Sequence, residues 1–316
     1  MMAAKGPPLL EREDHPSELF FLHEAPQREW HVAHAVWFWA MGVGSAAFVL
    51  RQGFAAGSVG RPFGLDAVDL LGIALVACGG LVLILDLGRP LRLLGALLRP
   101  RRSWISRGAV ADFVFLLCGT AYAAAGALHL PWGAAPFAAA DPLGRALILL
   151  CALCALVIMV YPGFVLQESW SVPLWNSPLV PVLFLGLALA SGAGLLVLMV
   201  PGVAAPSLLW AGLAADLLAI GALALYLVER GRAEDPAAGL GLRRLLLGRG
   251  APLFWSGALL GLLVPAAIMG LALAGAAPRP LILAGGALLL LGGFWLRYAQ
   301  LLSGVRRTAL GWREGR

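Results

Sequence analysis

Long apolar runs alternate with short polar segments along most of this chain. A helix needs about 20 apolar residues to cross the hydrocarbon core of a bilayer. Eight runs reach this length, at roughly residues 32–50, 66–85, 108–130, 144–166, 178–200, 207–228, 253–274 and 281–302. Because the backbone must satisfy its own hydrogen bonds in lipid, the pattern predicts an all-α fold, a polytopic bundle of eight transmembrane helices.

Composition agrees with this class and excludes a soluble domain. The chain is 60% hydrophobic and only 13% charged, with a mean hydropathy of +0.86, far from the values of soluble proteins. The first thirty residues are polar and lack the apolar centre of a signal peptide, so we expect the first span to remain in the mature protein. The predicted division is an N-terminal segment (1–30), a transmembrane domain (31–303) and a tail (304–316).

Positive charge predicts the orientation in the membrane. Six arginines lie between the second and third runs: Arg89, Arg92, Arg99, Arg101, Arg102 and Arg107. With eight spans this loop shares one side with both termini, and that side holds eighteen of the 23 Lys and Arg residues. The positive-inside rule therefore places both termini and this loop in the cytoplasm. The expected location is the bacterial inner membrane, as a multi-pass protein. The net charge of +6 is then a membrane-surface property, and we expect no nucleic-acid partner.

Polar side chains gather at the same predicted face. They come from four spans and the loop after the fourth: His31, His34, Asp86, Arg107, Tyr161, Gln167, Glu168 and residues 171–176. A bundle that brings them together forms a pocket with apolar walls and a polar end, which suits a lipophilic ring with carbonyl groups. Interfacial Trp, Tyr and Arg are also common headgroup anchors, and the two interpretations have similar weight from the residues alone.

Three carboxylates lie deeper in the spans. A charged residue at the bilayer centre costs about 2.5–3.5 kcal/mol on insertion scales, so each should face the interior. For Asp69 we favour a structural hydrogen bond. Asp112 lies within reach of Arg107 or Asp86, and Asp112 and Asp216 are candidates for a proton path. For Asp216 the structural and proton-conducting interpretations are equally supported.

Metal cofactors are not expected in this chain. A haem needs axial ligands that face each other at one depth, whereas His31 and His34 lie at one membrane face and His129 at the other. The four cysteines, Cys78, Cys118, Cys151 and Cys154, all fall within spans, where cysteine behaves as a small apolar residue. We therefore expect no haem, no iron–sulfur cluster and no metal site.

Four short motifs occur in order along the chain: DLGRP (86–90), SWISRG (103–108), YPG (161–163) and PLWN (173–176). With their spacing relative to the spans, the chain resembles the NrfD/polysulfide reductase membrane-subunit family from about Trp30 to at least Gly194. The resemblance implies an anchor subunit of a respiratory molybdopterin oxidoreductase. Such a subunit exchanges electrons between quinone, either menaquinone or ubiquinone, and a four-cluster, ferredoxin-like iron–sulfur subunit, while the molybdopterin catalytic subunit performs the substrate chemistry.

The resemblance also implies roles for single residues. Those assigned to quinone binding are His34, Trp37, Asp86, Arg89, Arg107 and Tyr161, and those assigned to partner binding or loop ordering are Ser103, Trp104, Trp175 and Asn176. Tyr161 matches a family tyrosine that hydrogen-bonds the quinone, and His34 matches a polar position at the start of the first span. Both can donate to carbonyls that gain negative charge on reduction. Arg107 and Asp86 can order the loop as a charge-assisted pair.

A secondary transporter or proton-conducting protein is the alternative function. Transporters often contain repeats and a polar site at the midplane. Spans 1–4 and 5–8 show no convincing repeat, and the polar groups cluster at one face. Asp216 is the main residue in favour of this alternative. The arginine bias places the partner subunits of the leading interpretation in the cytoplasm.

Overall fold

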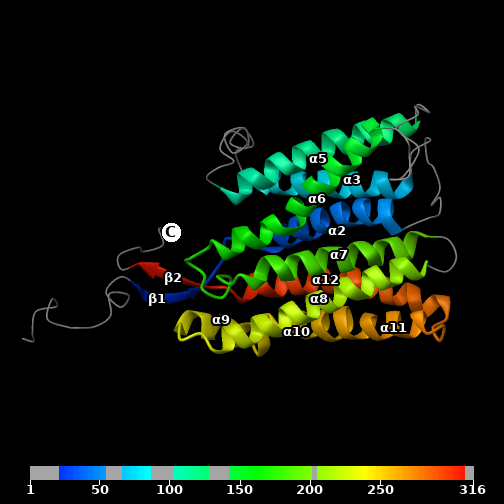
Figure 1. Cartoon of the computed structure of the whole chain (residues 1–316). Helices are drawn as coiled ribbons and strands as arrows, with labels where there is room; N and C mark the ends of the chain where they lie inside the picture. The colour runs from blue at the N-terminus through cyan, green and yellow to red at the C-terminus, as the bar shows by residue number, and fades with distance from the viewer. Residues whose placement is uncertain (1–20, 55–65, 87–102, 128–141, 201–204, 310–316) are drawn as a thin grey trace, which may run out of the picture.

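A computed structural model describes residues 21–54, 66–86, 103–127, 142–200 and 205–309. Within these ranges, eight helical segments are long and apolar enough to cross a membrane (Figure 1). They are α2 (Val32–Phe54), α3 (Ala67–Asp86), α5 (Trp104–Ala127), α6 (Pro142–Gln167), α7 (Leu179–Met199), α8 (Pro206–Gly231), the continuous α10–η3–α11 segment (Ala251–Trp255, Ser256–Leu263, Val264–Leu273) and α12 (Arg279–Ser303). The prediction of an eight-helix bundle is confirmed, with ends that differ by a few residues.

Helices α2 and α7 form the centre of the bundle. In each, 67% of the most apolar window is buried, compared with 28% in α3, and α2 lies between α3 and α7 in Figure 1. Small residues permit close approach between helices, as is usual in membranes. A Cβ on Gly44 of α2 would lie 2.5 Å from the carbonyl oxygen of Gly72 in α3. The outer helices therefore rest on a core built around α2 and α7.

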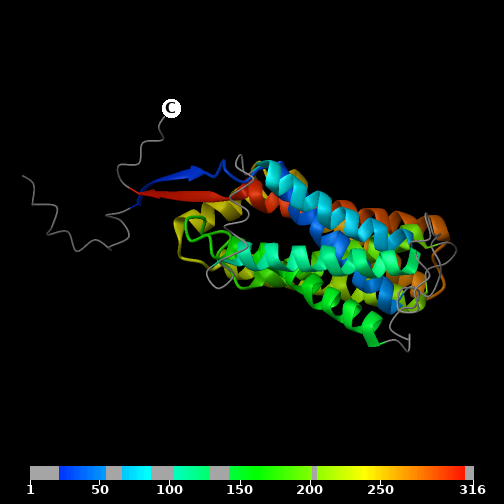
Figure 2. The same ribbon diagram turned by 90° about the horizontal axis from the view of Figure 1, so that it is seen from above.

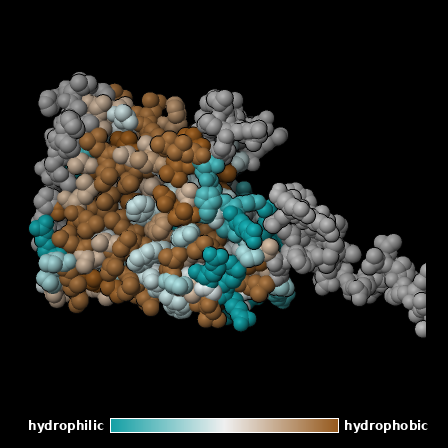
Figure 3. Space-filling view, turned by 180° about the vertical axis from the view of Figure 1, so that it is seen from behind, coloured by the Kyte–Doolittle hydropathy of each residue, from teal (hydrophilic) through white to brown (hydrophobic). Residues whose placement is uncertain are grey.

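The outer surface is apolar, as a lipid-facing surface must be. A broad hydrophobic area covers the middle of the face in Figure 3, and hydrophilic residues lie towards its ends. Exposed side chains on the outer helices include Leu81 of α3 and Phe113 and Leu117 of α5. The hydrophobic runs of the sequence thus become both the core and the lipid-facing surface.

The seventh span has a local irregularity. Between α10 and α11 the chain forms the π-helical segment η3 (Ser256–Leu263), followed by Pro265 in the first turn of α11. Proline has no N–H to donate to the carbonyl four residues earlier, here that of Gly261. A Cβ on Gly261 would lie 2.3 Å from the Cα atom of Gly292 in α12. A π-helical segment is one of the usual irregularities where the regular hydrogen bonding of a helix is interrupted.

Two short strands and one helix lie outside the spans. Strand β1 (Phe21–Pro26) pairs antiparallel with β2 (Val305–Ala309), and both views show this sheet at one end of the bundle, with α9 (Pro236–Leu246) at the same end (Figures 1 and 2). The Arg306 guanidinium pairs with Glu29, and that of Arg307 pairs with Asp235, the N-cap of α9. The polar segments before the first span and after the last are therefore joined.

Candidate functional site

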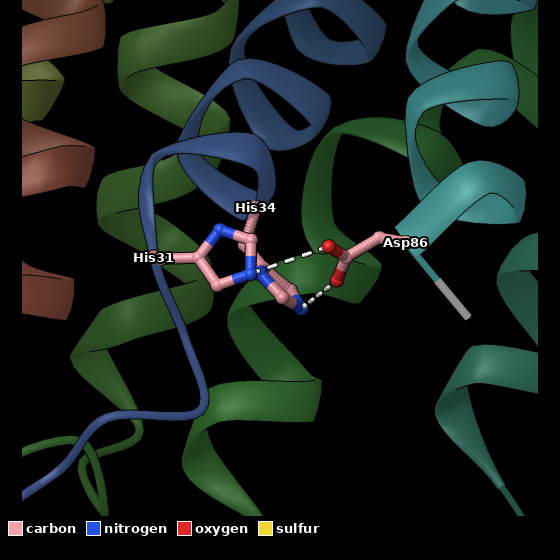
Figure 4. Close-up of side chains that lie close together, drawn as sticks. All are labelled: His31, His34 and Asp86. Atoms are coloured by element: carbon pink, nitrogen blue, oxygen red, sulfur yellow. Dashed lines mark ion pairs between the residues drawn. The ribbon is translucent and has the colours of Figure 1, made fainter. Parts of the chain in front are cut away.

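Two histidines at the start of α2 converge on the carboxylate that ends α3 (Figure 4). Nε2 of His31 lies 3.2 Å from Oδ1 of Asp86, and Nε2 of His34 lies 3.4 Å from Oδ2. Residues three apart at the beginning of a helix lie on one face, which explains why both rings reach the same partner. The His34 side chain is 14% exposed and that of His31 is 51% exposed. The pair thus reaches from the bundle interior to the surface.

Tyr161 of α6 is buried next to α5. Its hydroxyl donates to Oδ2 of Asp112 at 3.3 Å and lies 3.4 Å from Sδ of Met41. Gly108 leaves room for the ring, because a Cβ on that residue would lie 2.4 Å from Cε2 of Tyr161. Gly108, from the SWISRG motif, therefore leaves the space that the ring of Tyr161, from the YPG motif, occupies.

Trp37 connects the histidines with this tyrosine. Its ring centroid lies 6.2 Å from that of His34 and 6.2 Å from that of Tyr161. Trp30 extends the row on the other side, 4.8 Å from His34 and 5.8 Å from Trp175. A continuous series of aromatic rings thus runs from the loop after α6 to Tyr161.

A cavity of about 340 Å³ lies between α3 and α5 and reaches Tyr161. Its polar lining residues are Asp112 and Tyr161, and the other lining residues are Ala77, Gly80, Leu81, Leu83, Ile84, Ile105, Ala109, Phe113 and Leu116. Leu81 and Phe113 are also exposed on the outside of the bundle, by 53% and 60%. The cavity therefore has its rim at the lipid-facing surface. Its volume falls within the range of small-molecule pockets, and a few polar groups in an apolar wall are typical of them.

One polar atom of the cavity lining, Oδ1 of Asp112, is buried and has no hydrogen-bond partner among the described residues. Nδ1 of His34, which does not line the cavity, is also buried and without such a partner. Buried polar atoms in native proteins are nearly always paired, with protein or with another molecule. An unpartnered carboxylate oxygen in the cavity lining therefore favours a site that is completed by a ligand.

The start of α5 is held by aromatic contacts. Trp104 stacks on Phe164 of α6, with centroids 4.1 Å apart and planes at 8°. The Arg107 guanidinium lies 4.3 Å from the Trp104 centroid, and the carbonyl of Ser103 accepts a hydrogen bond from the Arg107 N–H at 3.1 Å. These contacts fix α5 against α6 beside Tyr161. Arg89 lies outside the described residues.

Trp175 and Asn176 hold the loop between α6 and α7. Trp175 is buried and its Nε1 donates to the carbonyl of Gln300 at 2.9 Å, while Nδ2 of Asn176 donates to the carbonyl of Gln167 at 2.6 Å. Tyr226 donates to the Leu174 carbonyl at 2.9 Å. These contacts hold the loop between α6 and α7, and the role in partner binding or loop ordering assigned to Trp175 and Asn176 stays a prediction.

The two carboxylates predicted for a proton path lie on different parts of the bundle. Asp112 is on α5, next to Tyr161 of α6, whereas Asp216 is on α8. Helices α2 and α7 lie between α5 and α8 in Figure 1. Asp216 is fully buried, and both of its carboxylate oxygens are without a hydrogen-bond partner in the described part of the chain. The described residues do not bring the two carboxylates together.

Arg297 is a buried cation that the motifs did not identify. It is 1% exposed in α12, where Nη1 donates to the carbonyl of Gly293 at 2.7 Å and Nη2 donates to that of Phe184 at 3.3 Å. Its guanidinium also lies 5.3 Å from the Phe184 ring. The signal in the sequence was a single arginine inside an apolar run, which marks an inward-facing residue. Arg297 joins α12 to α7.

Fold and site together define a polytopic membrane subunit with a lipid-accessible cavity. Residues 22–309 match the family described as "Polysulphide reductase, NrfD". The chain belongs to this family, whose members are membrane subunits of molybdoenzyme complexes and are associated in general with quinone and with iron–sulfur and catalytic subunits. The resemblance in the four motifs is thus confirmed, and the match extends to the last span. No curated protein matches the chain.

Proposed function

We propose that this chain is the quinone-reactive anchor of a respiratory molybdopterin oxidoreductase, exchanging electrons between membrane quinone and an iron–sulfur subunit. The observation that carries the proposal is the cavity between α3 and α5, where Tyr161 and Asp112 are the polar residues in an otherwise apolar lining. Because Leu81 and Phe113 form both its wall and part of the outer surface, a membrane-dissolved ligand can enter from the bilayer.

The residues of the cavity suit both the apolar ring and the polar carbonyl groups of a quinone. Apolar side chains of α3 and α5 enclose the ring. With a quinone bound, the Tyr161 hydroxyl turns its one hydrogen from Asp112 to a carbonyl that becomes more basic as electrons arrive. Reduction of a quinone to a quinol takes two electrons and two protons. The iron–sulfur partner supplies the electrons when quinone is reduced and accepts them when quinol is oxidised, and the two protons are taken up or released accordingly. Protons are supplied through the His34–Asp86–His31 cluster, whose members range from 14% to 51% exposed and so connect the interior with water.

The experiment is purification of the tagged chain from native membranes, followed by extraction of bound quinone. We expect a menaquinone or ubiquinone in the extract, molybdenum in the preparation, and the visible absorption of iron–sulfur clusters from co-purified subunits. A preparation with neither bound quinone nor redox-active partners, although the chain is folded, would contradict the proposal.

The cytoplasmic orientation is part of the proposal. The arginine-rich side of the predicted topology corresponds to the end of the bundle that carries the β1–β2 sheet, α9 and the His34–Asp86 pair. We therefore propose that the iron–sulfur subunit binds at this end, in the cytoplasm.

Reporter fusions at the C-terminus test this orientation. A fused GFP is expected to fluoresce, and a fused alkaline phosphatase is expected to be inactive, because only cytoplasmic GFP and periplasmic phosphatase mature. A fusion after Phe54, at the other end of α2, is the matched control and should give the opposite pattern. Active phosphatase at the C-terminus would place the partner subunits in the periplasm.

Proton conduction is a second candidate function, favoured by one observation, the buried and unpartnered carboxylate of Asp216. Asp216→Asn keeps the shape of the side chain but removes its ability to exchange a proton. If protons pass through α8, the variant in proteoliposomes will lose proton uptake while quinol turnover continues. Because Asp216 lies apart from the cavity, we expect turnover within about twofold of the wild type. Unchanged proton movement in Asp216→Asn would remove this candidate.

A further inference from the structure

We propose that His31, His34 and Asp86 form a binding site for a divalent transition-metal ion, with zinc as the preferred ion. The site lies at the end of the bundle that carries the β1–β2 sheet. One potential ligand atom from each of the three residues lies within 4.8 Å of the other two. Figure 4 shows both imidazole rings, at the start of α2, directed at the same carboxylate, which is at the end of α3. An ion here would join two helices at the point where α3 ends.

The spacing of the three side chains is close to that of a zinc site. In a tetrahedral site with ligand bonds of about 2.0–2.1 Å, neighbouring ligand atoms are separated by about 3.3–3.4 Å. Nε2 of His31 lies 3.2 Å from Oδ1 of Asp86 and Nε2 of His34 lies 3.4 Å from Oδ2, and one ligand atom from each of the three residues lies within 4.8 Å of the others. The side chains therefore need only small movements to exchange their mutual contacts for bonds to a central ion.

The donor set selects the kind of ion. Two imidazole nitrogens and one carboxylate are typical zinc ligands, whereas magnesium and calcium prefer oxygen ligands throughout. Three protein ligands leave the fourth position for water, which is the arrangement of exchangeable or reactive sites rather than of closed structural sites. We therefore expect reversible binding at this site.

Neighbouring groups orient the ligands and leave the site accessible. Metal binding through Nε2 requires the proton of each ring on Nδ1. Nδ1 of His34 has no partner among the described residues, and Nδ1 of His31 gives up only a 3.4 Å contact with the Ala33 N–H. The Trp30 ring packs 4.8 Å from His34. With His31 51% and Asp86 29% exposed, an ion can enter from water.

Binding has a consequence for the proposed function. A metal ion would occupy the Nε2 atom of His34 and the Asp86 carboxylate, which we propose as the proton supply of the cavity. Zinc should then inhibit quinol turnover. This consequence rests on the proposed function, but the metal site itself does not.

The first test is titration of the purified full chain with zinc chloride alone, by isothermal titration calorimetry. We expect one zinc ion per chain, and His31→Gln should weaken binding by at least about tenfold because it removes a ligand. His23→Gln is the matched control, since His23 belongs to β1 at the same end of the protein. The absence of saturable binding, or equal affinity in wild type and His31→Gln, would overturn the site.

The second test is quinol turnover by the complete complex with increasing zinc. We expect zinc to inhibit the wild type and His23→Gln, and we expect at least about tenfold resistance to zinc in His31→Gln, with each protein compared with its own zinc-free turnover. Zinc binding that depends on His31 but leaves turnover unaffected would uphold the metal site and overturn the proton-supply role of His34. The two proposals can therefore fail separately.

Discussion

Replacement of Tyr161 by phenylalanine is expected to lower quinol turnover of the assembled complex by about 100-fold. The change removes only the hydroxyl, which lies 3.3 Å from Asp112 at the polar end of the cavity. A positioned donor to a reacting oxygen typically contributes about 10²–10⁴-fold. The ring itself, which packs on Gly108 and near Trp37, stays in place. The measurement is steady-state oxidation of a short-chain quinol by the purified complex.

The matched control is Tyr298→Phe, the same change on α12. Because Tyr298 does not line the cavity, this variant should retain turnover. Equal amounts of iron–sulfur and molybdopterin subunits in the preparations would show that assembly is intact. Wild-type turnover in Tyr161→Phe would mean that the cavity between α3 and α5 is not where quinol reacts.

Replacement of Gly108 by alanine is expected to reduce both turnover and stability. The added Cβ would lie 2.4–2.5 Å from three atoms of the Tyr161 ring, so the ring must move away from its position beside Asp112. Overpacking of this kind typically costs about 1–3 kcal/mol, and a displacement of about 1 Å near a reacting group can cost about 10²-fold in rate. We expect a lower melting temperature in detergent and at least tenfold lower turnover.

Gly221→Ala is the control for this prediction. Gly221 lies in α8, and a Cβ there would meet nothing within 4 Å. Alanine is the better helix former by about 1 kcal/mol, so this variant should be as stable as the wild type or slightly more stable. If both alanine variants behave alike, the contact between Gly108 and Tyr161 does not determine the tyrosine position.

The spans were predictable because their signal is local. A run of apolar residues such as 178–200 indicates its helix without knowledge of its neighbours, and α7 was found at Leu179–Met199. The motifs likewise identified the family, which the match over residues 22–309 confirms. The assignments of His34, Asp86 and Tyr161 to quinone binding remain predictions, although the structure places Tyr161 in a cavity.

Features that depend on distant contacts were not predictable. Strand β1 pairs with β2, and this pairing joins residues at the two ends of the described range. Gly108 was visible as a motif residue, but its role appears only when α5 meets α6. His31 was recognised as a polar residue at the correct face. Its shared partner with His34 depends on how α3 ends beside α2.

The β1–β2 pair also imposes an order on biogenesis. The ribosome releases β1 before the first span and β2 only after the eighth. Strand β1 therefore cannot pair with β2 until the eighth span has been synthesised, and the sheet closes after α12 has formed. A truncated or misinserted product leaves an open strand edge, which is a site for aggregation and for recognition by proteases. The small sheet thus distinguishes a completed subunit from an incomplete one before any partner binds.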